Sequence, residues 1–102
     1  MKNNMYYCSI KDIPKYRDIK MFCSFRIKAT EDVYFELRTS NIPNIREAIC
    51  VYKHIKDDVE LLFSGRLNEN NYDSAMRVLK DYYYQERIWK DIEEKDRLKE
   101  DK

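Results

Sequence analysis

Residues 21–38 read MFCSFRIKATEDVYFELR, and this stretch decides the fold. In each half, apolar and polar residues alternate, which is the two-residue period of a strand with one buried face. The expected buried face comprises Met21, Cys23, Phe25, Ile27 and Ala29, followed by Val33, Phe35 and Leu37. The polar residues between the halves favour a turn, so we predict an antiparallel hairpin. Arg26 and Lys28 on one outer face can then pair with Glu36 on the other.

The segments on either side of this hairpin extend it. Residues 5–10 are aromatic and β-branched and predict a strand, and residues 59–63 predict another, closed by a turn at Gly65. Residues 40–55 have the features of a helix. Ser40 or Asn41 can cap its first amides, and the following apolar residues recur every three or four positions, namely Ile45, Ala48, Ile49, Tyr52 and Ile55.

A second amphipathic helix is expected from about Tyr72 to the C-terminus. Its apolar side comprises Tyr72, Ala75, Met76, Leu79, Tyr82 and Tyr83. The fold class that satisfies these patterns is α+β: a small antiparallel sheet of three to four strands, in the order β-β-β-α-β-α, with two helices packed on one face. We expect residues 1–84 to form a single domain and residues 85–102, with 13 charged residues, to extend the last helix.

Composition excludes several classes of function. The chain has 102 residues, one glycine and two prolines, and 43% of its residues are hydrophobic, which is enough for one folded domain. A single glycine cannot supply a glycine-rich phosphate loop, and no motif surrounds a Ser-His-Asp set. No apolar run is long enough to cross a membrane. Three widely spaced cysteines without a CxxC pair, and no signal-peptide pattern, favour a reduced, cytoplasmic protein.

Cys50 and His54 are the one pair that suggests catalysis. Four positions apart on the expected helix of residues 40–55, they would face the same way, as a thiolate and imidazole pair or two metal ligands do. Further ligands are lacking nearby except Asp57 and Asp58, so we expect no metal and no cofactor, and we expect the chain not to be an enzyme. A small enzyme around Cys50 and His54 is the second alternative.

Charge is distributed unevenly along the chain. The formal net charge is +1, but residues 1–30 carry seven Lys or Arg residues against two Asp residues. Basic residues interleaved with aromatic ones are typical of surfaces that neutralise phosphates and stack bases. The first alternative is therefore a nucleic-acid-binding regulator that uses Lys11, Lys15, Arg17, Lys20, Arg26 and Lys28.

The C-terminal helix gives the leading hypothesis. At about 100° per residue, Ile88 and Ile92 lie opposite the side that packs on the domain, and Trp89 lies at its edge. Large apolar side chains on a charged helix usually contact a partner, and Tyr and Trp often anchor interfaces. We predict a small non-enzymatic interaction protein that contacts another protein, or a protein–nucleic acid complex, through Tyr82, Tyr84, Ile88, Trp89 and Ile92.

Two further expectations follow from this hypothesis. The partner can be a second copy of the chain, in which case the protein is a homodimer. By analogy, a short chain of AT-biased composition without catalytic motifs is typical of phage or mobile-element proteins that inhibit a host or defence protein. We therefore expect this protein to inhibit or modulate its partner.

Overall fold

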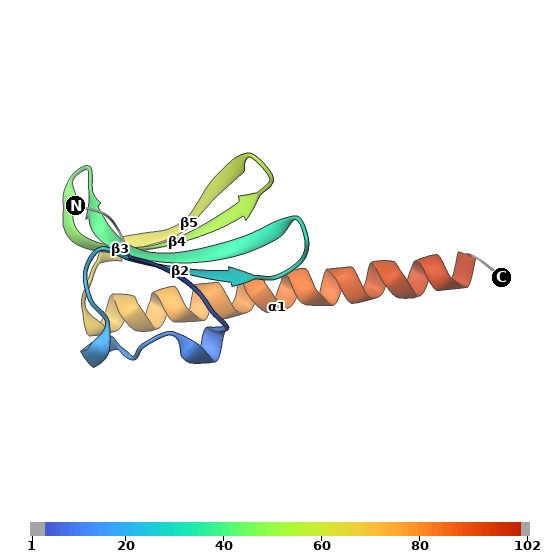
Figure 1. Cartoon of the computed structure of the whole chain (residues 1–102), viewed down its shortest axis with the longest axis horizontal. Coiled ribbons are helices and arrows are strands. Elements are labelled where there is room, and N and C mark those ends of the chain that lie inside the picture. Colours follow the sequence, from blue (N-terminus) through green and yellow to red (C-terminus); the bar gives the residue numbers. More distant parts are fainter. Residues whose placement is uncertain (1–3, 101–102) are drawn as a thin grey trace.

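The chain folds into a five-stranded sheet followed by one long helix, as the computed structural model shows (Figure 1). The structure describes the backbone of residues 4–100 and the side chains of residues 4–89. The strands are β1 (Asn4–Tyr7), β2 (Cys23–Lys28), β3 (Val33–Ile42), β4 (Ile45–Ile55) and β5 (Asp58–Arg66), and the helix is α1 (Glu69–Glu100). The α+β class is therefore confirmed.

The strands lie side by side in the order in which they occur in the sequence. The strand expected over residues 5–10 is shorter, because β1 ends at Tyr7. β1 pairs with β2 in parallel, and every other neighbouring pair is antiparallel, so the sheet is mixed rather than antiparallel as predicted. The predicted hairpin is confirmed as β2–β3, with Phe25 opposite Leu37 and Arg26 opposite Glu36. The parallel pairing requires a crossover, which residues 8–22 provide through two short 3-10 helices, Ile10–Asp12 and Tyr16–Asp18.

The core lies between one face of the sheet and α1. Phe35, Leu37 and Ile49 are fully buried on the sheet side, and Leu79 of α1 packs against the same cluster. The crossover closes one edge of the core through Ile13, which is buried. The predicted buried face of the hairpin is confirmed, because period two places these residues on the side that α1 covers.

The helix expected over residues 40–55 is wrong, because the end of β3, a tight turn and β4 occupy this segment. Asn44 adopts a left-handed conformation, with φ of 72°, in the tight turn from β3 into β4, and Asn tolerates this conformation well. Positions 48–51 are all buried, so apolar residues occur on both faces of the strand and imitate a helical spacing. The sheet therefore has five strands rather than three or four, and one helix rather than two packs on it.

The last predicted strand is confirmed as β5, but its side chains are arranged differently. A register shift between Val51 and Tyr52 places Phe63 opposite Val51 and Leu61 opposite Tyr52, so Leu61 and Phe63 face opposite sides of the sheet. Gly65 lies within the strand rather than in a turn. A Cβ atom at this position would lie 2.9 Å from Asn71 Nδ2, so glycine permits the close approach of α1.

The helix α1 continues well past the end of the sheet (Figure 1). No described helix combines the length and the apolar character that a membrane-spanning segment needs.

Candidate functional site

The projecting part of α1 starts where its side chains leave the sheet. Glu86 forms an ion pair with Lys53 of β4, and Arg87 Nη1 donates a hydrogen bond to the carbonyl oxygen of Ala29 at 3.1 Å. These two contacts hold the helix to the ends of the strands. Beyond them the backbone stays helical to Glu100. The predicted boundary between a domain of residues 1–84 and a helical extension of residues 85–102 stays a prediction. The contact of Arg87 lies three residues beyond Tyr84.

Four of the five predicted partner-binding residues are described, and all four are exposed. Trp89 is 63% exposed, Ile88 and Tyr84 are each 57% exposed, and Tyr82 is 38% exposed. The side chain of Ile92, the fifth, lies outside the described residues. The isolated chain therefore does not bury its only tryptophan.

Helical geometry fixes the directions of these residues. Leu79 is fully buried against the sheet, and Ile88 follows it by nine residues, which at about 100° per residue is the opposite side of the helix. Tyr84 lies four residues before Ile88 and shares its side. Trp89 lies about 100° around the helix from Ile88. The exposed apolar residues thus cover an arc wider than one stripe, and this arc, Tyr84, Ile88 and Trp89, is called the outer helix surface.

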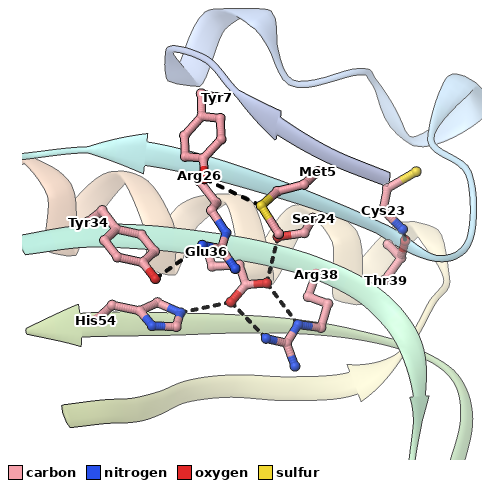
Figure 2. Close-up of polar contacts among 10 residues, drawn as sticks. All are labelled: Met5, Tyr7, Cys23, Ser24, Arg26, Tyr34, Glu36, Arg38, Thr39 and His54. Atoms are coloured by element: carbon pink, nitrogen blue, oxygen red, sulfur yellow. Dashed lines mark hydrogen bonds and ion pairs between the residues drawn. The ribbon is translucent and has the colours of Figure 1, made fainter. Parts of the chain in front are cut away.

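A second cluster lies on the face of the sheet that α1 leaves uncovered (Figure 2). Its centre is Glu36 of β3, which is only 1% exposed. Ser24 Oγ donates to Glu36 Oε2 at 2.6 Å, and Arg38 donates through Nε at 2.8 Å and Nη2 at 2.9 Å. His54 Nε2 lies 2.8 Å from Glu36 Oε1. Both carboxylate oxygens therefore have at least two partners.

Aromatic rings and guanidinium groups cover this buried carboxylate. The ring of Tyr34 stacks on His54 with centroids 4.2 Å apart, and Arg26 lies over the same tyrosine at 5.3 Å. Arg38 lies over the ring of Tyr52 at 4.7 Å. Cross-strand neighbours create these contacts, because Tyr34 is opposite His54 in the sheet. The cluster therefore closes over Glu36 without a second protein layer.

The polar cluster keeps Glu36 ionised. Burial alone would raise the pKa of Glu36, but hydrogen bonds from Arg38, Ser24 and His54 outweigh it and hold the pKa at about 2. The sequence-based expectation paired Glu36 with the cations of β2. Arg26 is indeed opposite Glu36, yet the carboxylate of Glu36 forms its ion pair with Arg38 and contacts His54. Sequence spacing gave no signal for His54, which comes from the strand mistaken for a helix.

Cys50 and His54 lie on β4 instead of a helix. They share one face of the sheet, but four residues of strand separate their Cα atoms by roughly 13 Å. Cys50 is fully buried, and burial raises the pKa of its thiol, which disfavours the nucleophilic thiolate. His54 is engaged with Glu36. The adjacent pair that the enzyme alternative requires is therefore not formed, and the absence of enzymatic activity stays a prediction.

The six basic residues of the nucleic-acid alternative do not form one surface. Lys11, Lys15, Arg17 and Lys20 lie on the crossover, beside the core and the start of α1. Arg26 and Lys28 alternate with the core residues of β2 and therefore lie on the uncovered face. A nucleic-acid-binding role stays a prediction, and the basic residues that it needs lie on two sides of the sheet.

Neither a search for metal-ligand clusters nor comparison with known proteins adds to the description of these sites. Within the described residues, no three His, Cys, Asp or Glu side chains converge as metal ligands would. Comparisons with known protein families, curated proteins and solved structures found no match.

Proposed function

We propose that the protein is a small non-enzymatic binding protein whose outer helix surface docks into an apolar groove of another protein. The observation that carries this proposal is the exposure of Ile88 and Trp89 on a helix segment that has left its own core. Each buried apolar side chain of this size contributes about 1.5 to 3 kcal/mol when it leaves water. Binding therefore gains most from these two residues and from Tyr84.

The shape of the surface favours a concave partner. Tyr84 and Ile88 follow one another at the four-residue spacing of helix-in-groove anchors, and Trp89 lies about 100° away on the flank. One straight helix of a second copy would cover a single stripe and leave either Ile88 or Trp89 in water. A groove contacts both sides of the helix at once. We therefore favour a different protein over a homodimer formed by this segment.

The charged residues of the extension suit the same role. Glu86 and Lys90, Asp91 and Lys95, and Glu93 and Arg97 are spaced to form pairs four residues apart, each worth about 0.2 to 0.5 kcal/mol. A helix as short as the part of α1 beyond Arg87 is only marginally stable in water when isolated. A sequence with pairs at this spacing favours a helix at the anchors before binding, which lowers the ordering cost of association. Occupation of the partner's groove would inhibit or modulate that partner, as a phage or mobile-element inhibitor does.

The double variant Ile88→Ala with Trp89→Ala tests the proposal. Removal of two anchors of this kind is expected to weaken partner binding by about 100-fold or more, while folding is retained because neither side chain is buried. Quantitative capture from native lysate, with the wild type and the double variant side by side, measures the loss for each co-purified protein.

The matched control is Arg77→Ala with Lys80→Ala, which changes two exposed residues of α1 alongside the sheet. The control is expected to retain the partner. A partner that the double variant captures as well as the wild type would contradict the proposal. Light scattering of the purified protein is expected to give a monomer, and a stable dimer that the double variant abolishes would assign the surface to a second copy.

A further inference from the structure

We propose that a hollow on the uncovered face of the sheet binds the phosphate group of a small phosphorylated molecule. The hollow has a volume of about 320 Å³, within the range of small-ligand sites. None of its lining residues belongs to the outer helix surface, so it is a second site rather than a part of the first. Its lining comes from β1, β2, β3 and two turns, and comprises Tyr7, Arg26, Lys28, Thr30, Glu31, Asp32, Val33, Tyr34 and Lys56.

Three unpaired cations line this hollow. In the part of the chain that the structure describes, Arg26, Lys28 and Lys56 form no ion pair. The three positive charges repel one another, and an anion between them relieves this repulsion. The carboxylates of Glu31 and Asp32 also line the hollow and leave it a formal charge of +1. A single anionic group therefore suits it better than a long polyanion.

Arg26 supplies the second observation. Its Nη1 donates to the hydroxyl oxygen of Tyr34 at 3.3 Å, and its enclosed Nε has no hydrogen-bond partner among the described residues (Figure 2). A buried donor left unpaired costs about 1 to 3 kcal/mol. A guanidinium group binds phosphate oxygens through two parallel N–H donors. Because the Nε of Arg26 is enclosed, its side chain has to turn to present the Nε–H and a terminal N–H to a ligand in the hollow.

The backbone of Lys56 supplies the third observation. This residue has φ of 54° in the turn between β4 and β5, a left-handed conformation that costs a non-glycine residue energy. Its amide donates to the carbonyl oxygen of Asp32 at 3.3 Å and so joins the two turns beside the hollow. Glycine would form this turn with less strain. A lysine here instead adds a cation to the hollow.

The remaining lining suits an organic group attached to the phosphate. Tyr7 is exposed, so its ring offers a surface for a ring or a short carbon chain. The hydroxyl oxygen of Thr30 accepts from the amide of Val33 at 3.1 Å, which leaves its proton free to donate to an oxygen of the ligand.

Titration with phenyl phosphate, inorganic phosphate and phenol tests this proposal, with the Nε–H resonance of Arg26 followed by NMR. We expect phenyl phosphate to shift this resonance saturably at millimolar concentration or below, and phenol to leave it unchanged. Phenyl phosphate binding more tightly than inorganic phosphate assigns Tyr7 to the organic group. Equal affinities assign the site to the phosphate alone, and both results support the proposal.

Variants separate the site from non-specific attraction. Lys28→Gln combined with Lys56→Gly is expected to weaken phenyl phosphate binding about tenfold, because two charge-assisted contacts are lost. The second change also relieves the strained turn, so the variant is expected to stay folded. Lys15→Gln, a change on the exposed crossover, is the control and is expected to alter affinity less than twofold. Absence of any saturable shift, or equal weakening by the control, would overturn the proposal.

Discussion

The fate of single residues in this protein depends on which face of the sheet they occupy. Glu36 follows the buried Phe35 on β3 and therefore faces away from α1, where a glutamate would normally reach water. Here Ser24, Arg38 and His54 bind its carboxylate. The side chains of Arg26, Tyr34 and Tyr52 enclose these groups. The cluster buries Glu36 where no second layer of protein covers the sheet. Its hydrogen bonds favour the ionised carboxylate, so the charge of Glu36 contributes to folding. The stability should therefore depend on pH.

Stability is expected to fall in acid chiefly through Glu36. Its pKa is lowered from 4.5 to about 2 in the folded protein, so the stabilisation is full above the ordinary pKa and is lost as pH falls towards 2. The shift corresponds to about 3 kcal/mol. Urea unfolding of Glu36→Gln at pH 7 should show a loss of this order, and at pH 2 the variant and wild type should differ by less than about 1 kcal/mol.

The exposed Glu60 provides the control, since Glu60→Gln makes the same chemical change outside any described ion pair. Little change is expected at either pH. If Glu36→Gln unfolded with the same free energy as the wild type at pH 7, the cluster would not stabilise the fold.

At the scale of elements, residue patterns predicted strands with one buried face and missed the strand buried on both. Period two in residues 21–38 identified β2 and β3 because the uncovered face there is mostly polar. In β4, Ala48 and Cys50 lie on the same face of the sheet as the polar cluster yet are buried, so no polar alternation remained to distinguish a strand from a helix. The C-terminal helix was correctly predicted because its apolar side is continuous through Leu79 and its outer side is charged.

The two ends of α1 are expected to differ in their contribution to stability. Leu79 is fully buried, so Leu79→Ala should lower the free energy of unfolding by about 2 to 5 kcal/mol through lost burial and a cavity. Ile88→Ala should change it by less than about 0.5 kcal/mol, because Ile88 is exposed. Thermal unfolding followed by circular dichroism measures both. A destabilisation by Ile88→Ala comparable to that of Leu79→Ala would mean that the extension packs on its own domain.

At the scale of the whole molecule, the chain separates a compact sheet domain from a projecting helix (Figure 1). The outer helix surface could be predicted from sequence, since helical geometry alone places Ile88 opposite the core. The Glu36 cluster and the phosphate hollow could not, because both depend on strand pairings that bring Ser24, His54 and Lys56 together across the sheet. The spacing of residues within one segment predicts which face of a helix is buried. The register of the five strands, in contrast, is set by pairing between different segments of the chain.

The accessibility of Trp89 tests the central claim most directly. Because it is the only tryptophan, growth with 5-fluorotryptophan gives one ¹⁹F resonance, whose shift between H₂O and D₂O reports solvent contact. In the free chain we expect the full solvent-dependent shift, independent of protein concentration. In the complex with the captured, unlabelled partner we expect the resonance to move and this shift to be lost. A tryptophan that is protected in the free monomer, or equally accessible in the complex, would contradict the account.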